Sequence, residues 1–416
     1  MRARALAPLA VWLALLPAEA RSSGYEFDGV GARAVARGGA VTAAATDWTA
    51  IYWNPAGLAG GDRHVGVEAR AGKMYSKDGN SFNVLGTNPF DKTRASSGFA
   101  FGSVGAVIPL TEDSALGTGI YTPLMQGSKF MDATSDPAVL ADSLDYESSV
   151  LAAVGNISYA RRLGERLSAG VGVNTLYGDL GSESDIHWTA LAAFVPELAS
   201  VANKTQRNVS DASGYGVEAV GGLRYAVNGD WAVGLVARSG ATIKLKGEEE
   251  VFLDGVSQDK SDFEYPVKHP ATTAVGVLWR ASDSLTLTFD CAQTWWKGFS
   301  SAMTYSKPSS FLANRANSYD WDNSVKFRLG ALKRLDGPYE VMGGYAFDTF
   351  AIDGGSVDFS TAIDVPMHRF SGAVTRKGKN FDATLAALAG GGKRTSEGVE
   401  YSVWGWYVMG EGKYRF

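Results

Sequence analysis

Apolar and polar residues alternate in short segments along most of the chain beyond residue 62. The clearest segment spans 285–291 and reads Leu-Thr-Leu-Thr-Phe-Asp-Cys, so every second side chain is apolar. The segments 167–173 and 325–329 follow the same rule. A period of two is that of a β-strand. One apolar and one polar face on strand after strand is typical of a barrel with lipid outside and a polar lumen inside. The pattern therefore predicts an all-β fold, a transmembrane antiparallel β-barrel.

About fourteen such strands can be counted, an even number, as a closed bacterial barrel requires. Closure matters because an open sheet edge in hydrocarbon would leave backbone groups unpaired. The candidate strands lie near 64–75, 96–109, 114–124, 146–163, 166–178, 214–227, 231–246, 268–280, 285–298, 321–335, 338–348, 366–377, 380–391 and 401–416.

The connections between these strands alternate in length. Short turns are predicted at 110–113, 164–165, 228–230, 282–284, 336–337 and 378–379. Long loops are predicted at 76–95, 125–145, 179–213, 247–267, 299–320 and 349–365. Outer-membrane barrels place short turns on the periplasmic side and long loops outside the cell. The alternation therefore assigns a side of the membrane to each end of the barrel.

The first twenty residues have the three regions of a secretory signal. Arg2 and Arg4 form the charged region, an apolar run follows, and Ala18-Glu19-Ala20 is a cleavage motif, so we expect cleavage after Ala20. The apolar run is short for a membrane anchor. Residues 21–62 are then predicted to form a Gly/Ala-rich plug, or hatch, inside the lumen, and residues 63–416 the barrel with its extracellular loops.

Composition narrows the class of protein further. The 416 residues include 50 Gly, 17 Tyr and 11 Trp, which suits bent barrel strands and aromatic girdles at the membrane interfaces. Mean hydropathy is only -0.08, because the apolar residues are dispersed. Cys291 is the only cysteine, so no intrachain disulfide can form. The formal net charge is -5 without a polybasic run, which argues against nucleic acid as a partner.

The stretch 29–61 combines many small residues with a cluster of aromatic ones. It contains Gly38-Gly39-Ala40, then Asp47, then the string Ile-Tyr-Trp-Asn-Pro-Ala-Gly-Leu at 51–58. This string resembles the N-terminal hatch of the FadL/TodX (OMPP1) family, outer-membrane transporters of long-chain fatty acids and hydrocarbons. Shorter matches follow in order along the chain, among them 343–348 and 366–370. The alternative is an ordinary glycine-rich loop that leads into a β-domain.

The resemblance implies a function and a gate. It implies passive transport of hydrophobic molecules across the outer membrane of a Gram-negative-type bacterium, by loop capture, lumenal binding, hatch gating and lateral exit into the membrane lipid. In the family a kink in the third strand opens the barrel wall. Here Pro123 is a candidate for the kink, as are Gly117 and Gly119, although Pro123 could simply end the strand. The predicted hatch and gate residues are Trp53, Asn54, Pro55, Ala56, Gly57 and Pro123.

Two predicted loops carry apolar residues at helical spacing. Asp136 and Pro137 suit a helix start, and a second helical pattern spans 187–203, interrupted by Pro196. In the family two such loops form a groove that captures ligand, although the two helices could instead bury their apolar faces against each other. The groove residues would be Leu124, Met125, Phe130, Met131, Val139, Leu140, Leu144, Trp188, Leu191, Phe194, Val195 and Leu198.

Cationic residues on the polar strand faces form a second candidate site. Lys326 and Arg328 share one face, and Arg224 and Arg369 could join them in the lumen. A fatty acid would use one such cation for its carboxylate. Because barrel lumens are commonly lined by charge ladders, we favour the alternative that these cations pair with Asp and Glu. A hydrocarbon ligand would need no cation.

Other features bear on partners and on competing functions. The terminal Phe416 resembles the signal recognised by the barrel-assembly machinery, and we expect a monomer. We predict no enzymatic activity, cofactor or metal site: the four histidines lie in separate segments, without metal-ligand spacing, and no G-x-S-x-G motif occurs. A hydrophilic porin, and a FadL-like shuttle or scaffold barrel for protein export, remain alternatives to hydrophobic transport.

Overall fold

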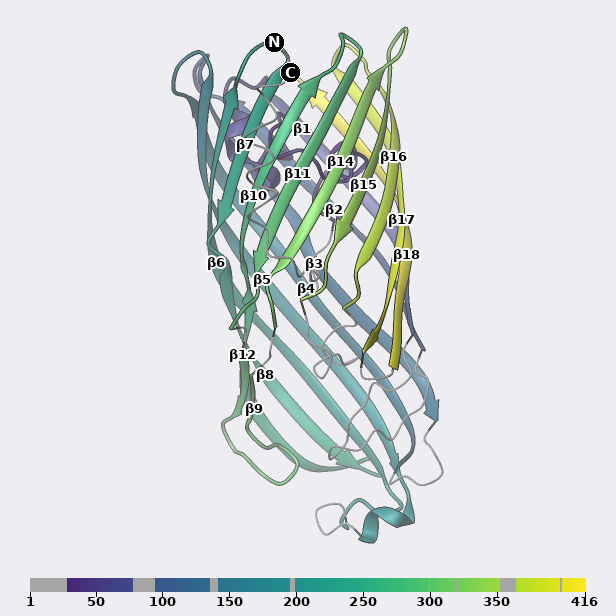
Figure 1. Cartoon of the computed structure of the whole chain (residues 1–416). Coiled ribbons are helices and arrows are strands. Elements are labelled where there is room, and N and C mark those ends of the chain that lie inside the picture. Colours follow the sequence, from purple (N-terminus) through teal and green to yellow (C-terminus); the bar gives the residue numbers. More distant parts are fainter. Residues whose placement is uncertain are drawn as a thin grey trace.

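The computed structural model shows a closed barrel with the N-terminal segment inside it (Figure 1). It describes residues 28–77, 94–134, 141–194, 199–298, 300–318, 321–351, 364–396 and 399–416. The strands are β1 (His64–Lys77), β2 (Arg94–Pro109), β3 (Ser114–Thr134), β4 (Ala141–Arg162), β5 (Leu167–Trp188), β6 (Thr205–Ala226), β7 (Trp231–Arg238), β8 (Ala241–Leu253), β9 (Val256–His269), β10 (Ala271–Arg280), β11 (Leu285–Trp295), β12 (Ser300–Tyr305), β13 (Arg315–Ser318), β14 (Ser324–Arg334), β15 (Tyr339–Asp348), β16 (Met367–Arg376), β17 (Phe381–Ser396) and β18 (Val399–Arg415).

Within the described residues these eighteen sections make fourteen barrel strands. Four barrel strands consist of two sections each, namely β7 with β8, β9 with β10, β11 with β12, and β13 with β14. All neighbours are antiparallel, and β1 closes the barrel against β18 over fourteen paired residues. The predicted fold class and strand number are therefore confirmed. No helix in the described part of the chain is long and apolar enough to span a membrane.

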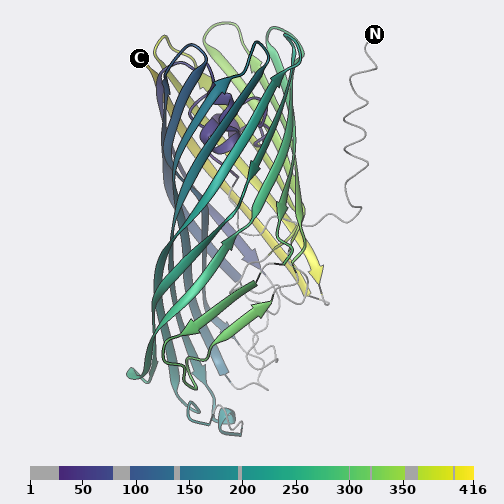
Figure 2. The same ribbon diagram turned by 90° about the vertical axis from the view of Figure 1, so that its left-hand side faces the viewer.

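The barrel is much taller on one side than on the other (Figures 1 and 2). Strands β3 to β6 have 21 or 22 residues, whereas β14 to β16 have 10 or 11. We call the end formed by the tips of β3–β6, β8 and β9 the tall end. The opposite end carries the short turns and the C-terminus, and we call it the hatch end.

All six predicted short turns join consecutive strands at the hatch end, but four predicted long loops contain strand: 299–320 holds β12 and β13, and three others are strand for much of their length. Strand β3 continues to Thr134 and β4 begins at Ala141, so most of 125–145 is strand. Similarly, β5 and β6 occupy 179–188 and 205–213, and β8 and β9 form a hairpin over most of 247–267. These stretches are rich in Ser, Asp, Glu and Lys, and a strand with two polar faces shows no alternation of apolar and polar residues.

The two predicted loop helices are likewise corrected. Leu144 lies in β4, paired with Ala133, and not on a helix. In the second loop the structure shows only a short 3-10 helix, η2 (Ala190–Phe194). This single turn, next to the end of β5, carries apolar residues whose spacing predicts a longer helix. Residues 135–140 and 195–198 of these patterns lie outside the described residues.

The hatch, described from residue 28, folds inside the barrel near the hatch end, where it is drawn in purple (Figure 2). It contains two single-turn helices, α2 (Ala32–Val35) and α3 (Ala50–Trp53), and the 3-10 helix η1 (Pro55–Leu58). Trp48, Ile51 and Leu58 are fully buried between the hatch and the wall. Small residues let this backbone fold tightly, and its aromatic residues fill the remaining space.

Candidate functional site

The string 51–58, which contains most of the predicted hatch and gate residues, forms a turn of the hatch. Asn54 caps η1 through its Oδ1, which accepts from the Ala56 nitrogen at 3.1 Å. Its Nδ2 donates to the Thr42 carbonyl in the hatch at 2.8 Å and to the Leu223 carbonyl of β6 at 3.0 Å. Pro55 takes the first position of η1, where no amide donor is needed. One side chain therefore fixes the turn internally and ties it to the wall.

Two further residues of that string fix the fold of the hatch. The indole of Trp53 donates to the Val30 carbonyl at 2.7 Å, and the Tyr52 ring stands edge-on to it. A Cβ at Gly57 would overlap the Ala45 carbonyl, so only glycine fits there. Asn54 to Gly57 and Trp53 thus have clear structural roles in the hatch.

Glycines in the barrel wall let the hatch approach the strands at backbone distance. At ten wall positions an added Cβ would overlap hatch atoms, in several cases backbone atoms that cannot turn aside. They are Gly66, Gly105, Gly117, Gly119, Gly170, Gly222, Gly234, Gly276, Gly330 and Gly344. We call this set the glycine girdle. It explains part of the high glycine content and shows that the hatch is docked around much of its circumference.

Gly117 and Gly119 belong to this girdle and do not kink β3. Both pair regularly with β2 and β4. Their missing side chains make room for Ile51 and Leu58 of the hatch. The predicted kink at these two positions is therefore wrong, because the absent Cβ is used for a close contact and not for a bulge.

Buried carboxylates of the wall accept hydrogen bonds from the hatch backbone. Glu68 of β1 accepts from the Gly31 nitrogen at 2.6 Å, and Asp290 of β11 accepts from the Thr42 nitrogen at 2.7 Å. Glu411 of β18 accepts from the Arg33 nitrogen at 3.2 Å. Charge-assisted bonds of this kind are strong in a dry interior. They hold the hatch on three separate strands.

The charged residues of the hatch are also paired. Arg33 contacts Glu340 of β15 at 2.7 Å. Burial opposes ionisation of Asp47, but the charge of Lys413, hydrogen bonds from Thr49 and the charge of Arg33 outweigh it. The pKa of the Asp47 carboxyl is therefore held below its ordinary value. Arg33 and Asp47 thus lie beside opposite charges inside the barrel.

Of the four predicted lumenal cations, three contact the hatch. Arg224 donates from Nε to the Ala43 carbonyl at 2.9 Å, and Arg328 lies over the Trp53 ring at 5.4 Å. Arg369 pairs with Asp28 of the hatch at 2.8 Å and with Asp348 of β15. Lys326, opposite Asp348 in the β14–β15 ladder, is buried in the wall. The structure thus places these cations in hatch and wall contacts.

A continuous cluster of apolar residues lines the lumen from the tall end to the hatch. Towards the tall end it includes Val251, Phe263, Tyr305 and Leu312, and beside the hatch it includes Tyr121. Its members in between are Ala212, Ile243, Leu245, Leu176, Val154 and Ala152. We call this cluster the apolar track. An apolar lining is unusual for a water-filled pore and suits a ligand that avoids water.

A break in the wall adjoins the end of the apolar track that lies beside the hatch. Strand β2 pairs with β1 over fourteen residues but with β3 over only six, and this ladder stops at Val104 and Ile120. In the described part of the chain no pair links 94–103 of β2 to 121–134 of β3. The β3–β4 register shifts between Tyr121 and Leu124, the interval that contains Pro123. The gate residue predicted in β3 therefore lies where the regular ladder ends.

Tyr121 stands at this break and meets the hatch. Its ring is edge-on to that of Tyr52, with the ring centres 5.5 Å apart. Its hydroxyl donates to Asn174 at 3.3 Å. Tyr52 and Tyr121 line a small cavity of about 20 Å³ between the hatch and the wall. Two aromatic side chains, one from the hatch and one from the wall, thus meet where the apolar track reaches the break.

The predicted groove residues are spread over different surroundings. Leu124, Met125, Phe130 and Met131 lie on β3 and Leu144 on β4, whereas Val139, Leu140, Val195 and Leu198 lie outside the described residues. Trp188 is buried at the end of β5 and donates to Gln206. Phe194 on η2 is 84% exposed and Leu191 is 43% exposed. The described part brings Leu191 and Phe194 together at the tall end.

Comparisons with known proteins agree with this geometry. The family profile described as "Outer membrane protein transport protein (OMPP1/FadL/TodX)" matches residues 14–367. Among solved structures, a FadL homologue of Pseudomonas aeruginosa is 14% identical with a TM-score of 0.77, and covers 95% of this chain and 100% of that one. The toluene transporter TbuX of Ralstonia pickettii is 19% identical with a TM-score of 0.71, covering 94% and 99%.

The toluene transporter TodX of P. putida gives a similar result. It is 15% identical with a TM-score of 0.71, and the alignment covers 94% of this chain and 99% of that one. At these identities the likeness shows the fold. A search of curated proteins found no match to this chain.

Proposed function

The chain belongs to the outer membrane protein transport protein family (OMPP1/FadL/TodX), and we propose that it carries hydrophobic molecules passively across the outer membrane. The ligand would be a long-chain fatty acid or a hydrocarbon. The observation that carries this proposal is the apolar track, which runs down the lumen and reaches the break between β2 and β3. Burial of each methylene on the track would contribute about 0.8 kcal/mol to binding, and net movement would be driven by the concentration gradient and by transfer of the ligand into lipid.

Capture would occur at the tall end, which faces the medium in this proposal. Exposed Leu191 and Phe194 on η2 provide apolar surface there. Together with the other predicted groove residues they would give a hydrophobic molecule its first contact. The ligand would then move onto the apolar track at Leu312 and Tyr305.

Exit would be lateral, through the break between β2 and β3. The glycine girdle and the buried carboxylates dock the body of the hatch against many strands, which favours a hatch that stays in place. Gating by the hatch would then reside in the Tyr52 ring and its contact with Tyr121. A rotation of these rings would connect the track to the lipid beside β3 without opening a path for water.

The lumenal cations have a different role in this proposal. Arg224, Arg328 and Arg369 hold the hatch, so the track itself can accept a ligand without a carboxylate. This is consistent with hydrocarbons as ligands. Phe416, which is exposed at the end of the chain, would serve the barrel-assembly machinery, and the closed barrel would act as a monomer.

A disulfide across the break tests lateral exit. Ser103 and Tyr121 both face the lumen at the first unpaired step beyond Val104 and Ile120. We expect oxidation of S103C/Y121C, made in a C291S background, to lower uptake of labelled oleate and toluene into cells by about tenfold, a change of about 1.4 kcal/mol. Reduction should restore uptake in the same protein.

The matched control is A106C/T118C, a disulfide across regularly paired residues of the same two strands. It should leave uptake unchanged in both redox states. If S103C/Y121C also transports equally well when fully oxidised, ligand does not leave between β2 and β3 and the lateral exit is wrong.

A further inference from the structure

A second break in the barrel wall lies far from the first in the strand order. The β10–β11 ladder ends at Ala271 and Trp295, and β9 meets β12 again only at Glu264 and Thr304. Between these points, in the part of the chain that the structure describes, no ladder pair links 265–270 to Trp296–Gly298 or to 300–303. The wall is therefore unpaired here over about six residues of β9 and its continuation.

Local sequence explains this break. Pro266 and Pro270 remove two amide donors from one strand within five residues. Gly240, with φ of 69°, forms a bulge in the neighbouring strand between β7 and β8, and a Cβ there would crowd the backbone of Pro270 at 2.7 Å. The burial alternation changes phase at both positions. His269 keeps the inward phase of Phe263 in β9, and the phase changes only after it, towards Gly276 of β10, so His269 faces the lumen at the break.

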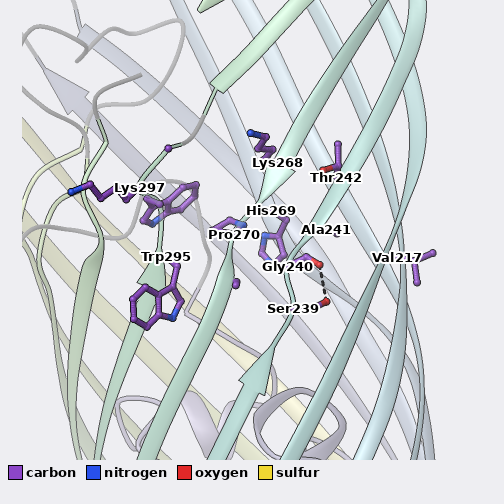
Figure 3. Close-up of a pocket in the computed structure, with 13 residues that line it drawn as sticks. Val217, Ser239, Gly240, Ala241, Thr242, Lys268, His269, Pro270, Trp295 and Lys297 are labelled. Carbon is purple, nitrogen blue, oxygen red and sulfur yellow. Dashed lines mark hydrogen bonds between the residues drawn. The ribbon is translucent and has the colours of Figure 1, made fainter. Parts of the chain in front are cut away.

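A pocket of about 420 Å³ occupies the break (Figure 3). Lys268, whose Nζ donates to Ser300 Oγ at 3.2 Å, lines it together with His269, Lys297 and Trp295, and none of the lining residues that the structure describes is a carboxylate. Val217 and Trp295 at its rim face outward, with 65% and 46% of their surfaces exposed. The pocket therefore opens on the outside of the barrel and has a positive mouth.

Two residues that line this pocket also border the lumenal side. His269 also lines the small cavity beside Tyr52 and Tyr121. Ala241, at the floor of the pocket, and Val267 pack against the apolar track. His269 is 8% exposed, and within the described residues its Nδ1 has no hydrogen-bond partner. Its Nε2 lies 3.7 Å from Glu218. An unpartnered polar atom in this position is available to a ligand.

We propose that this break is a second side opening, which binds amphiphiles with an anionic head. The head would sit between Lys268, His269 and Lys297, and the tail would pass Ala241 onto the apolar track. Neither feature alone would select this class, because a positive mouth suits any anion and an apolar floor suits any hydrocarbon. The combination fits a long-chain carboxylate. The inference rests on the proposed function, since the tail uses the track of the transport path.

Binding of two ligands with matched tails tests the inference. The double variant K268A/K297A should weaken binding of oleate to the purified barrel by at least about tenfold, because two charge-assisted contacts are lost. It should leave binding of oleyl alcohol unchanged, since the tail site is intact. K268R/K297R should restore oleate binding. The control K246A removes an exposed lysine of β8 that pairs with Glu264 outside the pocket, and it should affect neither ligand.

Three results would overturn the inference: oleate binding that is unchanged in K268A/K297A, an equal loss for both ligands, or the same loss in K246A. Failure of the proposed function looks different. If oxidised S103C/Y121C transports oleate and toluene normally, the exit between β2 and β3 is wrong whatever the lysines do. If that disulfide stops both ligands while K268A/K297A binds oleate normally, only the second opening is wrong.

Discussion

The hatch end and the tall end of the barrel are held together by different kinds of contact. At the hatch end, charges are buried and specific: Arg369 is 11% exposed and lies between Asp28 and Asp348. At the tall end, ion pairs are open to solvent. Arg207 and Glu183 are each nearly half exposed, and Lys246 and Glu264 are about two thirds exposed. Buried pairs are costly to break, whereas exposed pairs contribute little.

This difference separates a fixed part of the transporter from an adaptable one. Backbone contacts at the glycine girdle and buried carboxylates leave the hatch body little freedom. The apolar track is lined by side chains of the strands, and side chains can rearrange around a ligand while the ladder stays paired. A fixed plug at the hatch end of an adaptable lining directs the ligand sideways, towards a break in the wall.

The largest expected effect comes from filling a position of the glycine girdle. A Cβ at Gly344 would overlap the backbone nitrogen of Gly38, so Gly344→Val should displace the hatch. Planar-bilayer recordings should then show ion conductance at least about tenfold above the parent, because a displaced plug opens a water-filled lumen.

Gly343→Val is the matched control, because a Cβ at Gly343 meets no atom within 4 Å. It places the same side chain on the same strand, one residue away, and should conduct like the parent. Equal conductance of the two variants would show that the girdle does not hold the hatch.

A smaller effect is expected from breaking a buried ion pair. Arg369→Ala leaves Asp348 buried, with one of its positive neighbours lost, and should destabilise hatch docking by about 3–5 kcal/mol. Limited proteolysis of the hatch should become faster. Lys393→Ala, which removes an exposed partner of Glu400, should change stability by no more than about 1 kcal/mol. If Arg369→Ala and Lys393→Ala are cleaved at similar rates, the contrast between buried and exposed ion pairs is wrong.

The smallest effect is expected on the apolar track. Leu245→Asn places an amide among apolar side chains near Ile243. Leu245 is not among the atoms that crowd the glycine girdle. Toluene uptake should fall by about three- to tenfold, since a polar group there costs about 1 kcal/mol of ligand transfer. Lys246→Asn, on the outer face of the same strand, should be neutral. Unchanged uptake in Leu245→Asn would remove the track from the pathway.

The fold was predictable where one strand face is apolar. Alternation in segments such as 285–291 marks the membrane band, and the short turns follow from it. Prediction failed at the tall end because both faces of β5 near Glu183 are polar. Without lipid on one side, nothing in the pattern distinguishes a strand from a loop. These residues form strand because they pair with the neighbouring strand.

The candidate site was predictable only in part. The string 51–58 identifies the hatch because its small and aromatic residues are needed locally, as Asn54 shows. The partners of the hatch could not be found, since Glu68, Asp290 and Glu411 come from strands far apart in sequence. The only sequence signal for these partners is an acidic residue on the lumenal face of a strand. The second break, beside β9, was also not predicted, although Pro266 and Pro270 indicate an interrupted ladder.

The central claim is that ligand passes while the hatch stays docked, and a disulfide between hatch and wall tests it most directly. Ala43 of the hatch and Ala232 of β7 lie in one buried apolar cluster and are not glycine-girdle positions, so A43C/A232C joins the hatch to the wall without filling the girdle. In a C291S background, toluene uptake should be equal before and after oxidation. Uptake that stops on oxidation and returns on reduction would show that the hatch must leave its seat, and would contradict the account.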